Sequence, residues 1–327
     1  MERIVDMLAH GLAERGHEVT LFAHPDSKSP GGFMPWPGRS SQPVSDTLRN
    51  AATLARTVGQ GRFDVIHSFS RIAYLAPILP LAVPKIMSYQ RDISPKTVRL
   101  GHALSRDTLS LTAISRWMMA PVEHIGRWAL IPNGVPVARF TFRPSVASDA
   151  PLIFLGRVEE IKGPHLAIEI ARRTGRRLII SGNIPDEKRA WVEAHVLSKV
   201  DGNRVRYVGP VDDEQKNALL GEAGALLMPI LWEEPFGIVM AEAMACGTPV
   251  LGLNRGAVPE VVENGVTGFV CEKIDELVSA VAKLSTIDRK ACRDRVEQLY
   301  SDNAVVDAYE KLYFERLAEP RKAELHK

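Results

Sequence analysis

The feature that most constrains the fold of this sequence is an alternation of short apolar runs, rich in β-branched residues, with segments of helical period. The apolar runs lie at 18–22, 64–67, 84–87, 109–114, 129–131, 152–155, 177–180, 205–208, 224–228, 248–251 and 268–270. The helical segments lie at 43–60, 70–80, 115–126, 163–174, 186–198, 212–222, 236–246, 257–263, 273–284 and 287–318, the last broken near Ser301. Buried strands separated by helices are typical of parallel sheets. We therefore predict an α/β protein with two open, doubly wound parallel sheets.

The length of 327 residues is roughly twice that of a common domain, so we expect two domains. We predict a Rossmann-like N-terminal domain over 1–140 and a second Rossmann-like domain over 151–300. The linker is placed at 141–150, where Thr, Arg, Pro, Ser and Asp interrupt the periodicity. Residues 301–327 are predicted to form a C-terminal helix that can pack back on the N-terminal domain.

The sequence opens with an amphipathic helix over 3–15, whose apolar face carries Ile4, Leu8 and Leu12. A doubly wound domain normally opens with a strand and a glycine-rich turn before this helix. We therefore expect the first strand of the N-terminal domain to be missing. A strand position should then be vacant beside the strand at 18–22 or at 64–67.

Several classes of protein do not fit this sequence. The longest mostly apolar stretch, 72–83, is interrupted by prolines and is shorter than the roughly 20 residues of a membrane span. The N-terminus carries acids where a signal sequence would be apolar, so we expect a cytoplasmic protein, compatible with peripheral membrane contact. The three cysteines lack the paired spacing of a zinc site, and no nucleic-acid-binding module is present.

The segment 232–250 predicts a buried helix that begins near Gly237 and ends at Gly247. The amides at Phe236, Gly237 and Ile238 have no carbonyl one turn earlier to bond with. Because a helix N-terminus also carries partial positive charge, these amides suit a phosphate group. Gly237 has no side chain to block the approach.

Two carboxylates flank this helix start. Glu234 lies just before the helix, and Glu242 lies inside it among apolar and small residues, where an unpaired carboxylate would be costly. This arrangement suits a ligand with a diphosphate and hydroxyl groups on both sides of it. The alternative is a structural one, in which Glu234 caps the helix and Glu242 forms a salt bridge.

A second cluster lies after the first strand of the C-terminal domain, over 156–164. Ligand loops of α/β sheets occupy this position, and Arg157 and Lys162 would supply two cations to a diphosphate next to Gly156. Taken alone, the cluster also fits an ordinary loop with surface charges.

Together, these motifs resemble the retaining glycosyltransferases of family 4, the group 1 transferases. The resemblance rests on Gly156-Arg157, Lys162-Gly163, Glu234-Pro235-Phe236-Gly237, Glu242-Ala243-Met244-Ala245, Gly247-Thr248-Pro249-Val250 and the segment 258–269. Two acids separated by seven residues are the signature of that family. The match is strong in the C-terminal domain and looser in the N-terminal domain.

The resemblance implies the GT-B architecture, with two Rossmann-like domains facing a cleft, and a nucleotide-diphosphate sugar as donor. It implies no metal and no cofactor, because helix amides and cations take up the charge of the leaving diphosphate. Glu242 would bind the ribose hydroxyls and Glu234 the donor sugar. The donor-binding residues would be Gly156, Arg157, Lys162, Glu234, Phe236, Gly237, Ile238 and Glu242, with Glu234, Arg157 and Lys162 also catalytic.

The N-terminal domain would bind the acceptor, which is a sugar, a lipid-linked sugar or a small molecule. Its candidate residues are His67 and Gln90. Gln90 stands where family members usually carry a histidine, and a glutamine donates a hydrogen bond but does not titrate. A histidine at a strand end is also commonly structural.

The favoured function is therefore transfer of a sugar from a nucleotide sugar with retention of configuration. The main alternative is a catalytically impaired remnant that binds a nucleotide sugar or a partner. A two-domain solute-binding protein does not explain Glu242 in an apolar helix. A nonhydrolysing nucleotide-sugar epimerase is disfavoured by the motifs of the C-terminal domain.

Overall fold

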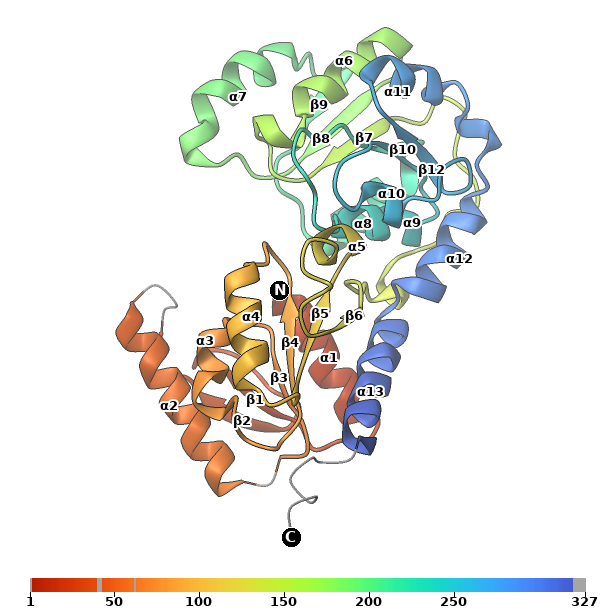
Figure 1. Ribbon diagram of the computed structural model, residues 1–327. Helices are drawn as coiled ribbons and strands as arrows, with labels where there is room; N and C mark the ends of the chain where they lie inside the picture. The colour runs from red at the N-terminus through yellow and green to blue at the C-terminus, as the bar shows by residue number, and fades with distance from the viewer. Residues whose placement is uncertain (1, 40–42, 62, 320–327) are drawn as a thin grey trace. The chain divides into compact units, whose positions relative to one another are not determined.

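A computed structural model describes residues 2–39, 43–61 and 63–319 and divides the chain into two compact units (Figure 1). Unit 1 comprises residues 1–133 and 302–327, and unit 2 comprises residues 134–301. The segment at 141–150 lies inside unit 2, because the Arg143 amide donates to the Cys246 carbonyl and the Arg289 guanidinium donates to the Arg143 carbonyl. The described residues include no helix with the length and apolar character needed to cross a membrane.

Unit 1 contains two parallel sheets. The smaller sheet pairs β1 (Thr20–Ala23) with β2 (Gly32–Pro35), and the larger has the order β3 (Ile66–Ser68), β4 (Lys85–Tyr89), β5 (Leu109–Ala113) and β6 (Arg127–Leu130). The sequence did not predict β2, which lacks β-branched residues. β1 and β3 belong to different sheets, in agreement with the expected vacant position beside one of these strands.

Helices cover both faces of the larger sheet. The helices of unit 1 are α1 (Glu2–Glu14), α2 (Val44–Gln60), α3 (Ile72–Leu75) with a 3-10 turn (Ala76–Ile78), α4 (Pro95–Leu104), α5 (Arg116–Met119) and α13 (Asp302–Ala318). Ile86 joins the cluster formed by α1 and α13, whereas its neighbour Met87 joins the cluster formed by α2, α3 and α4. This alternation follows from the period of two in a strand.

Two helical predictions in unit 1 were wrong. The helix predicted over 115–126 ends at Met119, because Pro121 lacks the amide hydrogen that would continue the helical hydrogen bonds. The sequence analysis missed α4, since Val98 and Gly101 are its only buried residues and its apolar period is weak.

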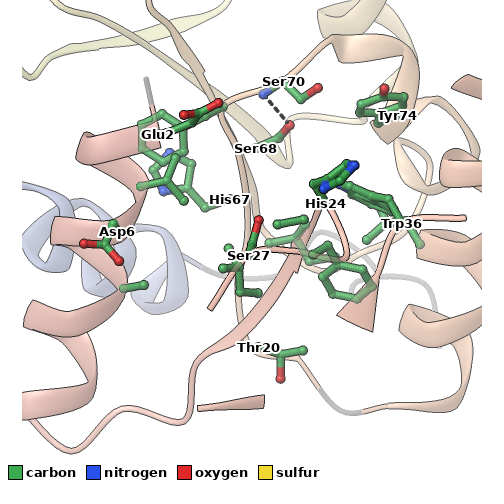
Figure 2. A pocket seen from close by; sticks show the side chains of 18 of the residues that line it. Glu2, Asp6, Thr20, His24, Ser27, Trp36, His67, Ser68, Ser70 and Tyr74 are labelled. Atoms are coloured by element: carbon green, nitrogen blue, oxygen red, sulfur yellow. Dashed lines mark hydrogen bonds between the residues drawn. The ribbon is translucent and has the colours of Figure 1, made fainter. Parts of the chain in front are cut away.

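A cavity of about 620 Å³ lies in unit 1 between β1 and β3 (Figure 2). Figure 2 shows Glu2 and Asp6 of α1 along one side of it and His24 and Trp36 along the other. The rings of Trp36 and Phe22 pack with their centroids 5.3 Å apart. The cavity therefore lies inside the layered structure of the unit.

Unit 2 is built on one six-stranded parallel sheet with the order β12-β11-β10-β7-β8-β9. The strands are β7 (Leu152–Leu155), β8 (Leu178–Ser181), β9 (Val205–Tyr207), β10 (Ala225–Met228), β11 (Val250–Leu253) and β12 (Gly268–Cys271). From β7 the chain first adds strands on one side and then, from β10 onward, on the other. This doubly wound order places the topological switch point between β7 and β10, where such sheets bind ligands.

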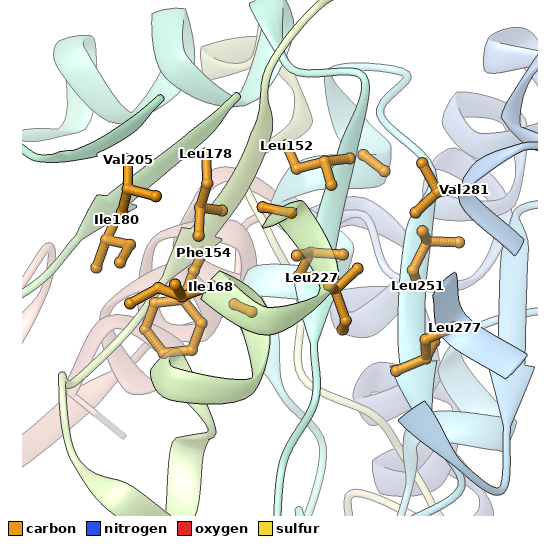
Figure 3. Packing of buried hydrophobic residues seen from close by; sticks show 14 of the residues in the cluster. Leu152, Phe154, Ile168, Leu178, Ile180, Val205, Leu227, Leu251, Leu277 and Val281 are labelled. Atoms are coloured by element: carbon orange, nitrogen blue, oxygen red, sulfur yellow. The ribbon is translucent and has the colours of Figure 1, made fainter. Parts of the chain in front are cut away.

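The helices of unit 2 pack on both faces of the sheet. They are α6 (Pro164–Thr174), α7 (Arg189–His195), α8 (Asp213–Glu222), α9 (Ile238–Ala245), α10 (Val258–Val261), α11 (Ile274–Val281) and α12 (Arg289–Leu299). Short 3-10 turns occupy Val137–Arg139, Glu160–Lys162, Asp186–Lys188, Leu197–Lys199 and Leu284–Thr286. Figure 3 shows Leu152, Phe154 and Leu178 of the strands packed with Ile168 of α6 and Leu277 of α11. These buried side chains give unit 2 its own core.

Candidate functional site

The predicted donor-binding residues of unit 2 lie on the loops that follow β7 and β10. Lys162 lies at the end of the loop after β7, and Glu234 lies on the loop after β10. Because these two strands flank the switch point, their loops meet at the carboxyl edge of the sheet. The structure thus brings together two residues that are 72 positions apart in the sequence.

Lys162 and Glu234 form a direct ion pair. The Lys162 ammonium donates to a Glu234 carboxylate oxygen at 2.7 Å, and the side chains are 19% and 11% exposed. The same ammonium lies 4.4 Å from the centre of the Trp232 ring, within the range of a cation–π contact. Both charges are therefore held in place, and each still reaches solvent.

Backbone contacts fix the two loops against each other. The Leu231 amide donates to the Ile161 carbonyl at 2.8 Å. Gly163, which ends the 3-10 turn, has a φ of 76°, and a Cβ there would lie 2.0 Å from the Pro229 carbonyl oxygen. Only glycine satisfies both the left-handed conformation and this close approach. The position of Lys162 relative to Glu234 is consequently set by the backbone.

The loop that carries Glu234 leads into α9 through Gly237. Gly237 caps the helix with a φ of 74°, and a Cβ there would lie 2.7 Å from Met240 Cε and 3.2 Å from Glu234 Cγ. Phe236 is buried and Ile238 is half-buried. The first amides of α9 therefore lie next to the Glu234 side chain. This arrangement suits the binding of an anion.

Glu242 lies in the middle of α9 and pairs with Lys216 of α8 at 2.5 Å. Lys216 and Glu242 are only 8% and 7% exposed, and Asp213 lies 3.2 Å from the same ammonium. The sequence analysis required a partner for Glu242 but did not identify Lys216. In the sequence, Lys216 was marked only by its place four residues into the helix predicted over 212–222. That helix carries no motif that would have indicated a partner for Glu242.

Arg157 and Gly156 occupy the start of the loop after β7. The Arg157 guanidinium is 53% exposed and lies 2.9 Å from the buried carboxylate of Glu159. The backbone of Gly156 passes close to the end of β8, since a Cβ on Gly182 would lie 1.7 Å from the carbonyl oxygen of Gly156. Arg157 is therefore the most solvent-accessible of the three predicted catalytic side chains.

His67, an acceptor-side candidate, belongs to a polar network inside unit 1. Its Nδ1 lies 2.6 Å from the Tyr313 hydroxyl, and its Nε2 lies 2.6 Å from Ser88 Oγ. Ser88 also contacts the Tyr309 hydroxyl at 3.1 Å and accepts from Thr112 at 2.6 Å. Burial lowers the pKa of His67 from 6.5 to about 3. These contacts attach α13 to β3, β4 and β5, and they favour a structural role for the ring.

Gln90, the second acceptor-side candidate, follows β4 directly and is half-buried. Its side-chain nitrogen is buried and has no hydrogen-bond partner among the residues that the structure describes. Among the residues that the structure describes, no direct contact joins Gln90 to His67. A buried donor without a partner is costly, so this group is available to a ligand.

Comparison with known families matches both parts of the chain. Residues 142–301 match the family model of glycosyl transferases group 1, and residues 1–139 match the model of glycosyltransferase family 4. The first match contains Lys162, Glu234 and Glu242, and the second contains His67 and Gln90.

Among curated proteins, a glycogen synthase of Mycobacterium tuberculosis is 28% identical, with 98% of this chain and 93% of that protein covered. A phosphatidyl-myo-inositol mannosyltransferase of Mycolicibacterium smegmatis is 29% identical, with 80% and 74% covered. A glycosyltransferase from Rickettsia africae has a similar fold, with a TM-score of 0.82, 18% identity and 98% and 95% coverage. Anabaena HepE, solved in complex with UDP, has a TM-score of 0.76, 18% identity and 96% coverage of both chains.

Proposed function

This chain belongs to the family 4, group 1 glycosyltransferases, and we propose that it transfers a sugar with retention of configuration and without a metal ion. The donor is a nucleotide-diphosphate sugar. The acceptor is a hydroxyl compound, for which a sugar, a lipid-linked sugar or a small molecule are the candidates. The anomeric carbon and the acceptor oxygen form the new bond, the nucleoside diphosphate leaves with the electrons of the broken bond, and the proton of the acceptor hydroxyl passes to the leaving diphosphate.

One observation carries the proposal. Two lysine–glutamate pairs are associated with α9: Glu234 of the pair Lys162–Glu234 precedes the N-terminus of the helix, and Glu242 of the pair Lys216–Glu242 lies within the helix. A helix N-terminus favours a diphosphate, and the flanking acids accept hydrogen bonds from hydroxyl groups. A nucleotide sugar carries these groups in the same order, with hydroxyls on both sides of its diphosphate.

The proposed roles follow from position. Glu242 accepts from the ribose hydroxyls, and Lys216 keeps its carboxylate ionised and oriented. Glu234 accepts from hydroxyls of the donor sugar. Lys162, Arg157 and the amides of Gly237 and Ile238 stabilise the negative charge that develops on the leaving diphosphate.

These assigned roles support a reaction without a metal ion or a cofactor. Fixed cations and oriented amides supply charge where it develops, and they do not reorganise during the reaction. Lys162 already pairs with Glu234 on the loop that leads into α9, so a small displacement of its flexible side chain would bring it to a phosphate oxygen.

The direct test is a transfer assay with UDP-, GDP- and ADP-sugars in the presence of chelator. UDP is the first choice, since Anabaena HepE was solved with it. Binding of each nucleotide is followed by thermal shift and calorimetry, and the anomeric configuration of the product by NMR. Glu169→Gln is the matched control, because Glu169 is an exposed carboxylate that pairs with Arg173 on the surface. Inversion of configuration, or strict metal dependence, would contradict the proposal.

A second candidate is a chain that binds a nucleotide sugar without turnover. The observation that favours it is the division of unit 1 into two sheets, because the acceptor side of this family lies in that unit. Tight nucleotide binding without transfer to any tested acceptor would select this candidate.

A further inference from the structure

Trp232 lies on the loop after β10, two residues before Glu234, and its side chain reaches Lys162 on the loop after β7. The Leu231 amide donates to the Ile161 carbonyl, and Trp232 and Lys162 are the residues that follow this bond on each loop. The Lys162 ammonium lies 4.4 Å from the centre of the indole ring. The backbone of both loops therefore places the cation against the ring.

The indole of Trp232 is not explained by packing of the loop. Its ring nitrogen is buried and has no hydrogen-bond partner among the residues that the structure describes. In unit 1 the indole of Trp128, by contrast, donates to the Ile125 carbonyl at 2.8 Å. A buried donor without a partner is costly, and a phenylalanine would fill the loop without this cost. Because an indole attracts a cation more strongly than a phenyl ring does, the residue type fits the contact with Lys162.

The contact matters because Lys162 has to change partners when the donor binds. In the free chain its ammonium donates to Glu234 at 2.7 Å. In the proposed function, on which this inference rests, Glu234 accepts from the donor sugar and Lys162 stabilises the diphosphate. A lysine side chain is long and flexible, so a lysine that has lost its carboxylate also loses its orientation. An aromatic face attracts a cation that lies within about 6 Å of the ring centre, so the ring contact survives a small shift of the ammonium.

We propose that Trp232 is a positioning residue of the donor site, whose ring holds the Lys162 ammonium while that ammonium passes from Glu234 to the diphosphate. Trp232 acts through Lys162 and does not itself contact the diphosphate. The charge that stabilises the leaving group is thus oriented before the reaction needs it. Less free energy is then lost in ordering a flexible side chain.

The second lysine of the site provides a comparison. In the proposed function, Lys216 keeps its carboxylate partner, Glu242, when the donor is bound. The Lys216 ammonium lies 5.7 Å from the centre of the Phe140 ring, which is a longer contact with a weaker aromatic partner. The closer contact, with an indole, therefore belongs to the lysine whose carboxylate is taken over by the donor.

The contact is tested first in the free chain by NMR. Reductive methylation with isotope-labelled formaldehyde places labelled methyl groups on the lysines and keeps their charge, and the signal of Lys162 is identified by its absence in Lys162→Met. Because the face of an aromatic ring shields nuclei above it, we expect this signal upfield of that of Lys311, whose side chain is 78% exposed. Trp232→Leu should remove the shift, and Trp232→Phe should keep part of it. An unshifted Lys162 signal in the parent would overturn the proposal.

The functional step is tested by calorimetric titration with UDP. Trp232→Leu should weaken binding by about three- to tenfold, the range expected for a cation–π contact. Trp232→Phe should lose less, because it keeps an aromatic face. In the Lys162→Met background, Trp232→Leu should change the affinity by less than about twofold, since a residue that acts through Lys162 has no effect without it. A full loss in that background, or equal losses in the phenylalanine and leucine variants, would overturn the proposal.

Trp191→Leu is the matched control for the loss of an indole. Trp191 is also half-buried in unit 2, but its ring stacks on the His195 ring with the centroids 4.8 Å apart. This variant should leave both the UDP affinity and the methyl signal of Lys162 unchanged. If it weakens UDP binding as much as Trp232→Leu does, the effect is a general loss of folding and the proposal fails.

Failure of this proposal and failure of the proposed function give different results. A parent chain that binds no nucleoside diphosphate would contradict the proposed function and the exchange of partners, whereas the methyl signal would still show whether Trp232 holds Lys162. In the transfer assay, Trp232→Leu should lower kcat more than it raises KM, because the charge on the leaving diphosphate develops fully only in the transition state. A change in KM alone would overturn the role of Trp232 in orienting this charge.

Discussion

The Lys216 ammonium lies 2.5 Å from a carboxylate oxygen of Glu242, and less than one tenth of either residue is exposed. A buried ion pair contributes little net stability, but removing one partner leaves a charge that is costly to bury. The pair joins α8 to α9 and sets the orientation of the carboxylate that we assign to the ribose.

We predict that Glu242→Ala weakens nucleotide binding by at least about tenfold, since each 1.4 kcal/mol of lost hydrogen bonding is a factor of ten. Glu242→Gln should lose less, because the amide keeps an oxygen that accepts from a hydroxyl. Calorimetric titration with the nucleoside diphosphate measures both. Since Asp213 remains beside Lys216, we expect both variants to fold. Unchanged affinity in the alanine variant would contradict the ribose role.

Gly237→Ala should reduce both stability and donor binding. The substitution costs about 1 kcal/mol for the left-handed backbone, and its Cβ would also displace Met240 and the Glu234 side chain. Gly175→Ala is the matched control, because Gly175 has a φ of 67° and no atom within 4 Å of a Cβ. Urea unfolding and nucleotide affinity are measured for both variants. The role of Gly237 in positioning Glu234 is disproved if the two variants lose binding equally.

Chelator should leave transfer activity unchanged. Lys162, Arg157 and the first amides of α9 supply the positive charge that a divalent ion would otherwise bring to the diphosphate. Initial rates are compared with EDTA and with added magnesium or manganese. A rate that falls to background in EDTA and recovers with metal would show that this charge assignment is wrong.

Folding stability should depend on the protonation of His67. Burial lowers its pKa to about 3, so between pH 6.5 and 3 the unfolded chain binds a proton that the folded chain does not. The stability that the neutral His67 ring contributes to the folded state is fully present above pH 6.5. It is lost as the pH falls, by at most about 1.4 kcal/mol per pH unit. Urea unfolding of the parent and of His67→Gln between pH 5 and 8 measures it. The parent should lose more stability on acidification, and identical pH slopes would count against an imidazole that stays neutral in the folded chain.

The sequence predicted most strands and the site loops, because these depend on local pattern. The runs at 152–155 and 224–228 are the strands that flank the switch point, and the motifs after them lie on the loops of the candidate site. Helix α9 begins one residue after Gly237, the position that the glycine favoured. Glycines, prolines and β-branched runs act within a few residues, so a single sequence reveals their effect.

Long-range pairing could not be predicted in the same way. Lys216 and Glu242 are 26 residues apart, and nothing in the residues around Lys216 distinguishes it from an ordinary surface lysine of a helix. The contacts of His67 with Tyr313 depend on α13, which is 246 residues away. Such contacts follow from the packing of whole elements, which a local pattern does not encode.

The placement of α13 in unit 1 has a consequence for synthesis of the chain on the ribosome. Tyr309 and Val305 of α13 complete the cluster around Leu8 and Ile86, yet they follow all of unit 2 in the sequence. At roughly 5–20 residues per second, translation of 134–301 takes on the order of ten seconds or more. During this time one face of the N-terminal sheet is covered by α1 but not yet by α13. Unit 2 therefore has all its residues available for folding first, and the earliest part of the protein to be synthesised is the last to close its core.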